Sequence, residues 1–188
     1  MSARVSRRTV TSGLLGVWAA ALNGGFTALA EEVPLRAGAG RKFFNAMEQP
    51  FVTAYADTLI PDTDTPGAVA VGVPALLDYM MATWASATTR SKLRKTLASM
   101  RLELDRAVGG PFATAVMDDR VRALTVLDAR WFAAEPGRPG PYRQLKILVG
   151  RLYYATRIGA TVELRYEPIP GDWKSDIPFA DVGRSWAT

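Results

Sequence analysis

The clearest amphipathic stretch of the sequence is TRSKLRKTLASMRLELDRAV (residues 89–108). Its apolar side chains recur every three or four residues, which predicts an amphipathic helix with one face on a hydrophobic core. That face carries Leu93, Leu97, Met100, Leu104 and Val108. Gly109, Gly110 and Pro111 follow directly and are typical of a helix end. This stretch therefore predicts a long helix on the surface of a helical protein.

The segments on either side show the same helical spacing. They predict helices over residues 49–60, 74–84, about 118–132 and 142–158, and a short helix near Pro111. Asp118 or Asp119 is expected to cap the helix that ends near 132. Loops rich in proline and glycine separate these helices at 61–72 and 135–141.

The expected fold is all-α, with very few residues in strands. About five helices form a single domain over residues 46–188, preceded by a loose lead-in at 31–45. From about residue 160 the chain is expected to be an extended tail. The residues that disfavour regular structure there are Pro168, Pro170, Gly171 and Pro178.

The helix predicted over 142–158 carries apolar residues on two opposite faces. One face has Leu145, Leu148, Leu152 and Ala155, and the other has Ile147, Tyr154 and Ile158. Such a helix is either central in its own domain or covered by a partner protein. The sequence leaves both explanations open.

Residues 1–30 are typical of a removable export signal. A basic start precedes a mildly apolar run, and Ala28 and Ala30 suit a signal-peptidase site that cleaves after Ala30. Ser6, Arg7 and Arg8 resemble the start of a twin-arginine signal, which exports folded proteins. An ordinary secretory signal or an uncleaved anchor is the alternative. The expected location is the periplasm.

The composition excludes several classes of function. The 188 residues include no cysteine and no histidine, which excludes disulfides, iron–sulfur clusters and covalently attached c-type haem. Three of the 23 basic residues lie in the signal segment, which leaves 20 against 18 acidic residues. This near balance gives little support for nucleic-acid binding.

No catalytic, cofactor-binding or metal-binding residue is predicted. Asp62 and Asp64 begin a calcium-loop pattern, but Pro66 and Val73 occupy positions that need ligands, so a turn is the better interpretation. The neighbours Asp118 and Asp119 would point about 100° apart on a helix, so they do not form an acid/base pair. Aromatic side chains could line a sugar site, although core or interface positions are commoner for them: Trp131, Tyr153, Tyr154, Tyr166 and Trp173.

Four sequence segments carry a resemblance to a known family. They are ADTLIPDTDTPGA (56–68), GVP (72–74), YYATRIGA (153–160) and LRYEPIPGDW (164–173). Together they resemble the gluconate 2-dehydrogenase subunit 3 family over about residues 51–177. The chain reads Tyr-Tyr-Ala-Thr-Arg at 153–157, where the family often has Tyr-Tyr-Thr-Ser-Glu.

The resemblance implies a small, non-catalytic subunit of a periplasmic sugar or sugar-acid dehydrogenase complex. Its partner would be a large flavoprotein of the glucose–methanol–choline class that holds FAD and depends on the small subunit for folding, assembly and twin-arginine export. A cytochrome c subunit with haem c would accept the electrons, and the complex alone would provide contact with the membrane. This chain would bind no cofactor and no nucleic acid.

The segments that carry the resemblance also suggest where the partner binds. The candidate interface residues are Asp64, Thr65, Pro66, Tyr154, Tyr166, Pro168 and Trp173. The alternative function is a freestanding periplasmic sugar-binding protein that uses the C-terminal aromatic residues. A hydrolase based on carboxylates is a third possibility, which the lack of an acid pair disfavours.

Overall fold

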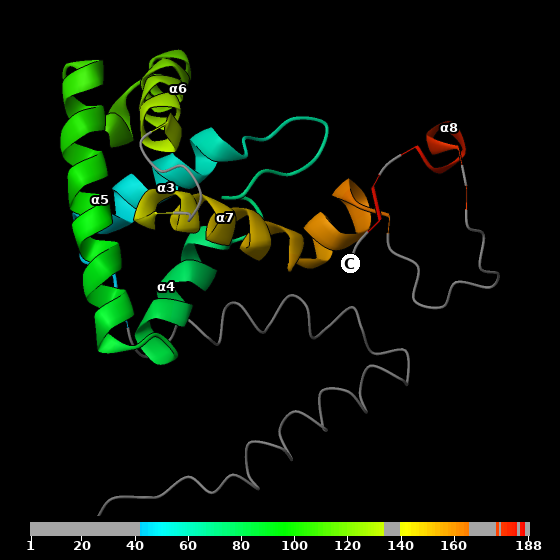
Figure 1. The fold of residues 1–188 in the computed structure, drawn as a ribbon, viewed down its shortest axis with the longest axis horizontal. Helices are drawn as coiled ribbons and strands as arrows, with labels where there is room; N and C mark the ends of the chain where they lie inside the picture. Colours follow the sequence, from blue (N-terminus) through cyan, green and yellow to red (C-terminus); the bar gives the residue numbers. More distant parts are fainter. Residues whose placement is uncertain (1–41, 134–139, 166–175, 177, 184, 187–188) are drawn as a thin grey trace, which may run out of the picture. The chain divides into compact units, whose positions relative to one another are not determined.

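The computed structural model describes residues 42–133, 140–165, 176, 178–183 and 185–186. Its α-helices are α3 (Glu48–Leu59), α4 (Val73–Thr83), α5 (Ala87–Val108), α6 (Met117–Ala133), α7 (Pro141–Tyr154) and α8 (Phe179–Val182) (Figure 1). A 3₁₀ turn, η1 (Phe112–Thr114), precedes α6, and a π-helical turn, η2 (Gly159–Glu163), follows α7. In these ranges β structure is limited to an isolated bridge between Arg165 and Trp186. The all-α fold predicted from the sequence is confirmed.

Helix α5 forms where its amphipathic pattern predicts it. The hydroxyl of Ser86 caps its first turn and accepts a hydrogen bond from the Thr89 N–H at 3.1 Å. Gly109 ends it in the left-handed conformation (φ +73°), which a residue with a side chain rarely adopts. The predicted apolar face is buried except for Val108, which is only partly covered. Burying each of those side chains stabilises the fold by about 2 kcal/mol.

The core lies where α3, α4, α5, α6 and α7 meet, and the ring of Phe112 lies 5.8 Å from that of Phe51. Its most completely buried large side chains come from five elements: Val52 and Tyr55 (α3), Val73 and Leu77 (α4), Met100 and Leu104 (α5), Phe112 (η1), and Tyr142, Val149 and Tyr153 (α7). The described residues belong to one compact unit. None of the helices in the described ranges is both long and apolar enough to span a lipid bilayer.

Polar contacts made by Arg120 and Asp128 help to fix α6 against its neighbours. Arg120 pairs with Asp57 of α3 at 3.0 Å, and its side chain is only 13% exposed. On the other side, Asp128 accepts hydrogen bonds from the Tyr142 hydroxyl and the Lys146 ammonium of α7, both at 2.7 Å. Burial raises the pKa of the Tyr142 hydroxyl, and the nearby Tyr55 and Asp128 raise this pKa further. The hydroxyl is therefore neutral and donates to the carboxylate.

Three local predictions were wrong. Helix α6 begins at Met117, so Asp118 and Asp119 lie inside its first turn, where acids suit the positive helix end, and do not occupy the cap position. Helix α7 ends at Tyr154 rather than near residue 158, because the N–H of Thr156 bonds to the carbonyl of Tyr153 at 3.0 Å, three residues back instead of four, and the Thr156 hydroxyl accepts from the Gly159 N–H at 3.1 Å. The tail is not uniformly extended, since it contains η2 and α8.

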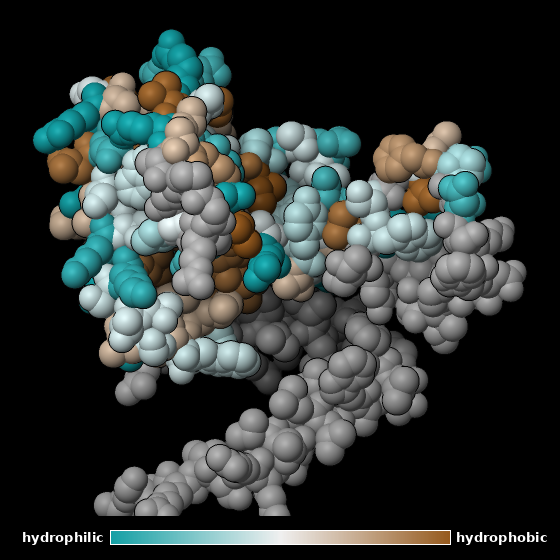
Figure 2. Space-filling model, in the orientation of Figure 1, coloured by the Kyte–Doolittle hydropathy of each residue, from teal (hydrophilic) through white to brown (hydrophobic). Residues whose placement is uncertain are grey.

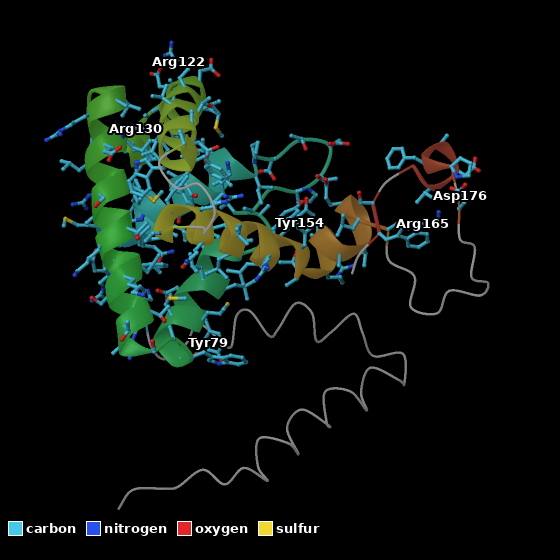
Figure 3. The ribbon with its side chains drawn as sticks, in the orientation of Figure 1. Tyr79, Arg122, Arg130, Tyr154, Arg165 and Asp176 are labelled. Carbon is cyan, nitrogen blue, oxygen red and sulfur yellow. The ribbon has the colours of Figure 1, made fainter. Side chains whose placement is uncertain are left out.

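Replacing Tyr142 by Phe should lower the free energy of unfolding by about 2 kcal/mol, because a buried hydrogen bond to a carboxylate is lost. Urea unfolding followed by circular dichroism measures the change. Tyr79→Phe is the matched control: Tyr79, labelled in Figure 3, makes no hydroxyl hydrogen bond within the described residues, so its change should stay under about 0.5 kcal/mol. Equal losses in the two variants would contradict a specific role for the bond to Asp128.

Candidate partner-binding surface

The loop between α3 and α4 is held in a defined shape by its own backbone. The N–H of Ala68 donates to the carbonyl of Ile60 at 2.8 Å, which brings the two ends of the loop together. Asp62 accepts a hydrogen bond from the Gly67 N–H at 2.5 Å. This carboxylate therefore serves the turn, as the sequence suggested. Within the described residues, no group of three or more acidic side chains could hold a metal ion.

Gly67 is required by the close approach of this backbone. A Cβ atom at this position would lie 2.6 Å from the carbonyl oxygen of Ile60 and 2.6 Å from the nitrogen of Asp62. Both of these are backbone atoms, so they cannot rotate away as a flexible side chain could. The turn therefore accepts only glycine at residue 67.

The loop is tied to the end of α7 and to η2. The hydroxyl of Tyr153 donates to the carbonyl of Pro66 at 2.9 Å, and the hydroxyl of Thr65 donates to the Glu163 carboxylate at 2.8 Å. Gly159 lets η2 pack back on α7, since a Cβ there would lie 2.2 Å from the carbonyl oxygen of Tyr153. The first bond joins residues that are 87 positions apart in the sequence, and the second joins residues that are 98 positions apart.

Exposed apolar side chains lie beside these ties. Tyr154 is 45% exposed, and its ring meets the buried ring of Tyr153 edge-on with 5.3 Å between centroids. Figure 3 labels Tyr154 at the C-terminal end of α7, close to the loop. Ile147, two turns earlier on the same face of α7, is 41% exposed. We call residues 61–69, Ile147, Tyr154 and 159–163 the loop–α7 surface.

The exposure of Ile147 and Tyr154 bears on one of the two explanations for α7. Its buried face carries Tyr142, Leu145, Val149, Leu152 and Tyr153. The helix therefore packs on the core by one face, and the explanation that it is central with both faces buried is wrong. On the face drawn in Figure 2, hydrophobic residues occur as separate groups among hydrophilic ones. An interface on such a surface would combine apolar anchors with polar contacts.

The structure brings together four of the seven predicted interface residues. Asp64 is exposed, and its carboxylate accepts from the Thr63 hydroxyl at 3.0 Å. Thr65 and Pro66 are half-buried by their ties to Glu163 and Tyr153, and Tyr154 is exposed. The other predicted interface residues, Tyr166, Pro168 and Trp173, lie outside the described residues. The same holds for the export residues: Ser6, Arg7, Arg8, Ala28 and Ala30.

Two residues of this surface were missed by the sequence reasoning. Glu163 gave no signal, because its role depends on Thr65, which lies 98 residues away. Gly159 lies in the segment YYATRIGA (153–160), but its close approach to the backbone of Tyr153 is visible only in three dimensions. The opposite-face positions Ile147 and Tyr154 were identified from helical spacing alone.

Replacing Gly67 by Ala should destabilise the fold by about 1–3 kcal/mol, because its Cβ would overlap backbone atoms that cannot move. Gly110→Ala is the matched control, since a Cβ at residue 110 meets nothing within 4 Å. Urea unfolding compares the two variants, and limited proteolysis of the loop reports the local change. A Gly67→Ala variant as stable and as protease-resistant as the control would refute the requirement for glycine.

Comparison with known proteins gives one family. The family model of gluconate 2-dehydrogenase subunit 3 matches residues 46–171, about two thirds of the chain. The match spans α3 to α7 together with the loop and η2. No curated protein and no solved structure matches the chain. The chain belongs to the gluconate 2-dehydrogenase subunit 3 family.

Proposed function

We propose that this chain is the non-catalytic small subunit of a periplasmic, FAD-dependent sugar or sugar-acid dehydrogenase. It binds the flavoprotein subunit of the glucose–methanol–choline class through the loop–α7 surface. It supports the folding and assembly of that subunit and carries it through the twin-arginine route. The observation that carries the proposal is the family match, whose description is that of one subunit of a dehydrogenase.

The chemistry of the chain supports an accessory role. Its sequence contains neither cysteine nor histidine, so it offers no thiolate or imidazole to ligate a haem iron. Several acidic side chains of the loop and of α6 are engaged in turns and ion pairs: Asp62 bonds to Gly67, and Asp128 bonds to Tyr142 and Lys146. In the proposed complex, FAD belongs to the flavoprotein and haem c to a cytochrome c subunit that accepts the electrons.

The shape of the loop–α7 surface supports binding of a protein partner. The loop is already fixed by Asp62, Thr65 and Tyr153, so it would lose little conformational entropy when it docks. Tyr154 presents a large ring with a polar end, which is the type of side chain that anchors protein interfaces. Its backing by the buried Tyr153 ring holds it in place.

Two of the aromatic residues that could line a sugar site, Tyr153 and Trp131, are covered wholly or partly by the chain itself. Tyr153 is only 2% exposed, and its hydroxyl is used by Pro66. Trp131 is partly buried against the core and stacks edge-on against Tyr142 at 5.2 Å. The buried Tyr153 cannot stack on a sugar, and Trp131 is partly covered by its own chain, so these two residues support the accessory role over a sugar site.

Replacing Tyr154 by Ala should weaken binding of the flavoprotein subunit about tenfold or more, which is the range of an interface anchor. Val126→Ala is the matched control, because Val126 is 68% exposed on a different helix, α6. Titration calorimetry between the full chain and the purified flavoprotein measures both variants, and circular dichroism checks that they fold. Undiminished binding by Tyr154→Ala would remove this residue from the interface.

The export role has its own test. Replacing Arg7 and Arg8 together by Lys should retain both this chain and the flavoprotein in the cytoplasm, because the export receptor recognises the arginine pair. Cell fractionation followed by a dehydrogenase assay on the periplasm measures the outcome. The single substitutions should have milder effects. Normal periplasmic activity in the double variant would contradict twin-arginine export while leaving the binding role intact.

A further inference from the structure

A basic groove lies at the N-terminal part of α5. It measures about 740 Å³ and is lined by Lys42, Arg90, Arg94 and Lys95, together with Phe43, Ala82, Ala87 and Ser91. We call these eight residues the basic groove. Its α5 residues recur at intervals of three and four and therefore share one face of the helix. No acidic side chain lines this groove.

The positive charge of the groove is largely uncompensated. From residue 84 to residue 102 the sequence contains five basic residues and no aspartate or glutamate. Arg94 pairs with Glu48 at 3.6 Å, and its guanidinium lies 4.6 Å from the centre of the Phe43 ring. It therefore packs against the other residues that line the groove. Within the described residues, Lys42, Arg90 and Lys95 form no ion pair.

The position on the helix increases this charge. Helix α5 has no acidic residue in its first turn, where the helix dipole is positive, and Arg90 lies in its fourth position. Basic side chains there repel the helix end and one another. An anionic surface would offset this repulsion for Lys42, Arg90 and Lys95 at the same time, because all three line one groove.

Trp84 lies in the turn that joins the two helices of the groove. It is 78% exposed, and it stands between the groove residues Ala82 and Ala87 in the sequence. A tryptophan exposed to this extent leaves a large apolar ring in water. Tryptophan side chains are enriched at the boundary between lipid headgroups and hydrocarbon. The apolar faces of the ring suit the hydrocarbon, and its N–H can bond to the headgroups.

We propose that the basic groove and Trp84 dock this chain on the surface of an anionic lipid bilayer. The lysines attract phosphate headgroups, and Trp84 inserts at the interface as a peripheral anchor. Lysine is depleted in protein–protein interfaces, so two groove lysines and the exposed Lys92 favour a lipid surface over an acidic protein. The chain would then contact the membrane directly, in contrast to the expectation that only the complex does so.

The test is co-sedimentation of the full chain with phosphatidylcholine vesicles, made with or without phosphatidylglycerol. The wild-type chain should bind the anionic vesicles more tightly than the neutral ones, and added salt should weaken that binding. Arg90→Gln with Lys95→Gln should weaken it about 25-fold, because each basic residue near an anionic surface contributes about fivefold. All variants keep residues 1–41, so a difference between them reports the groove.

Three further variants make the result specific. Arg106→Gln with Arg122→Gln removes the same charge from exposed positions elsewhere and should bind as the wild type does. Figure 3 shows Arg122 near the opposite end of α5 from the turn that joins α4 and α5. Arg90→Lys with Lys95→Arg keeps the charge and should also keep the binding. Trp84→Ala should weaken vesicle binding by about the same factor at low and at high salt, because salt does not screen an apolar contact.

Several outcomes would overturn the proposal. One is equal loss in the groove variant and in the Arg106/Arg122 control, which would mean that only total charge matters. Another is equal binding to neutral and anionic vesicles. A third is displacement by inorganic phosphate at constant ionic strength, which would indicate a site for free phosphate. A fourth is a groove variant that keeps its vesicle binding but loses the flavoprotein, which would indicate an acidic protein surface. Circular dichroism of each variant excludes unfolding as the cause of a loss.

Discussion

The hydroxyl of the buried Tyr153 donates to the carbonyl of Pro66 across 87 residues of sequence. This bond joins the α3–α4 loop to the end of α7, and the bond from Thr65 to Glu163 extends the contact to η2. The bonds inside the loop, from Ala68 to Ile60 and from Gly67 to Asp62, give the turn its shape, and the Tyr153 bond holds that turn against α7. The position of Tyr154 depends on it as well, because the ring of Tyr153 supports the ring of Tyr154.

Helices that carry a continuous apolar face could be predicted from the sequence. Helix α5 was expected over 89–108 and extends over Ala87–Val108, because its spacing, its cap and Gly109 all agree. The end of α7 could not be predicted in the same way. Its pattern continues to residue 158, yet the Thr156 N–H bonds only three residues back and its hydroxyl accepts from the Gly159 N–H, so the regular helix ends at Tyr154. Local side-chain bonds of this type compete with the helix and leave little trace in the hydrophobic pattern.

The candidate surface was only partly predictable for a similar reason. Spacing alone placed Ile147 and Tyr154 on a second face of α7, but it could not tell whether the chain itself covers that face. Only the packing of Leu145 and Val149 on the core shows which face is buried. The role of Glu163 depends on its bond to Thr65, which is remote in the sequence. The role of Gly159 depends on the chain folding back against the backbone of Tyr153. Tertiary contacts of this kind have no signature in a single sequence.

We propose that this chain has no redox chemistry of its own and binds a flavoprotein. Affinity purification of the tagged chain from the periplasm is the experiment that checks both statements. We expect a larger FAD-bearing protein to co-purify in stoichiometric amount, with flavin absorbance that stays with the larger protein when the two are separated. Recovery of the tagged chain alone, or flavin that remains bound to this chain after separation, would contradict the account.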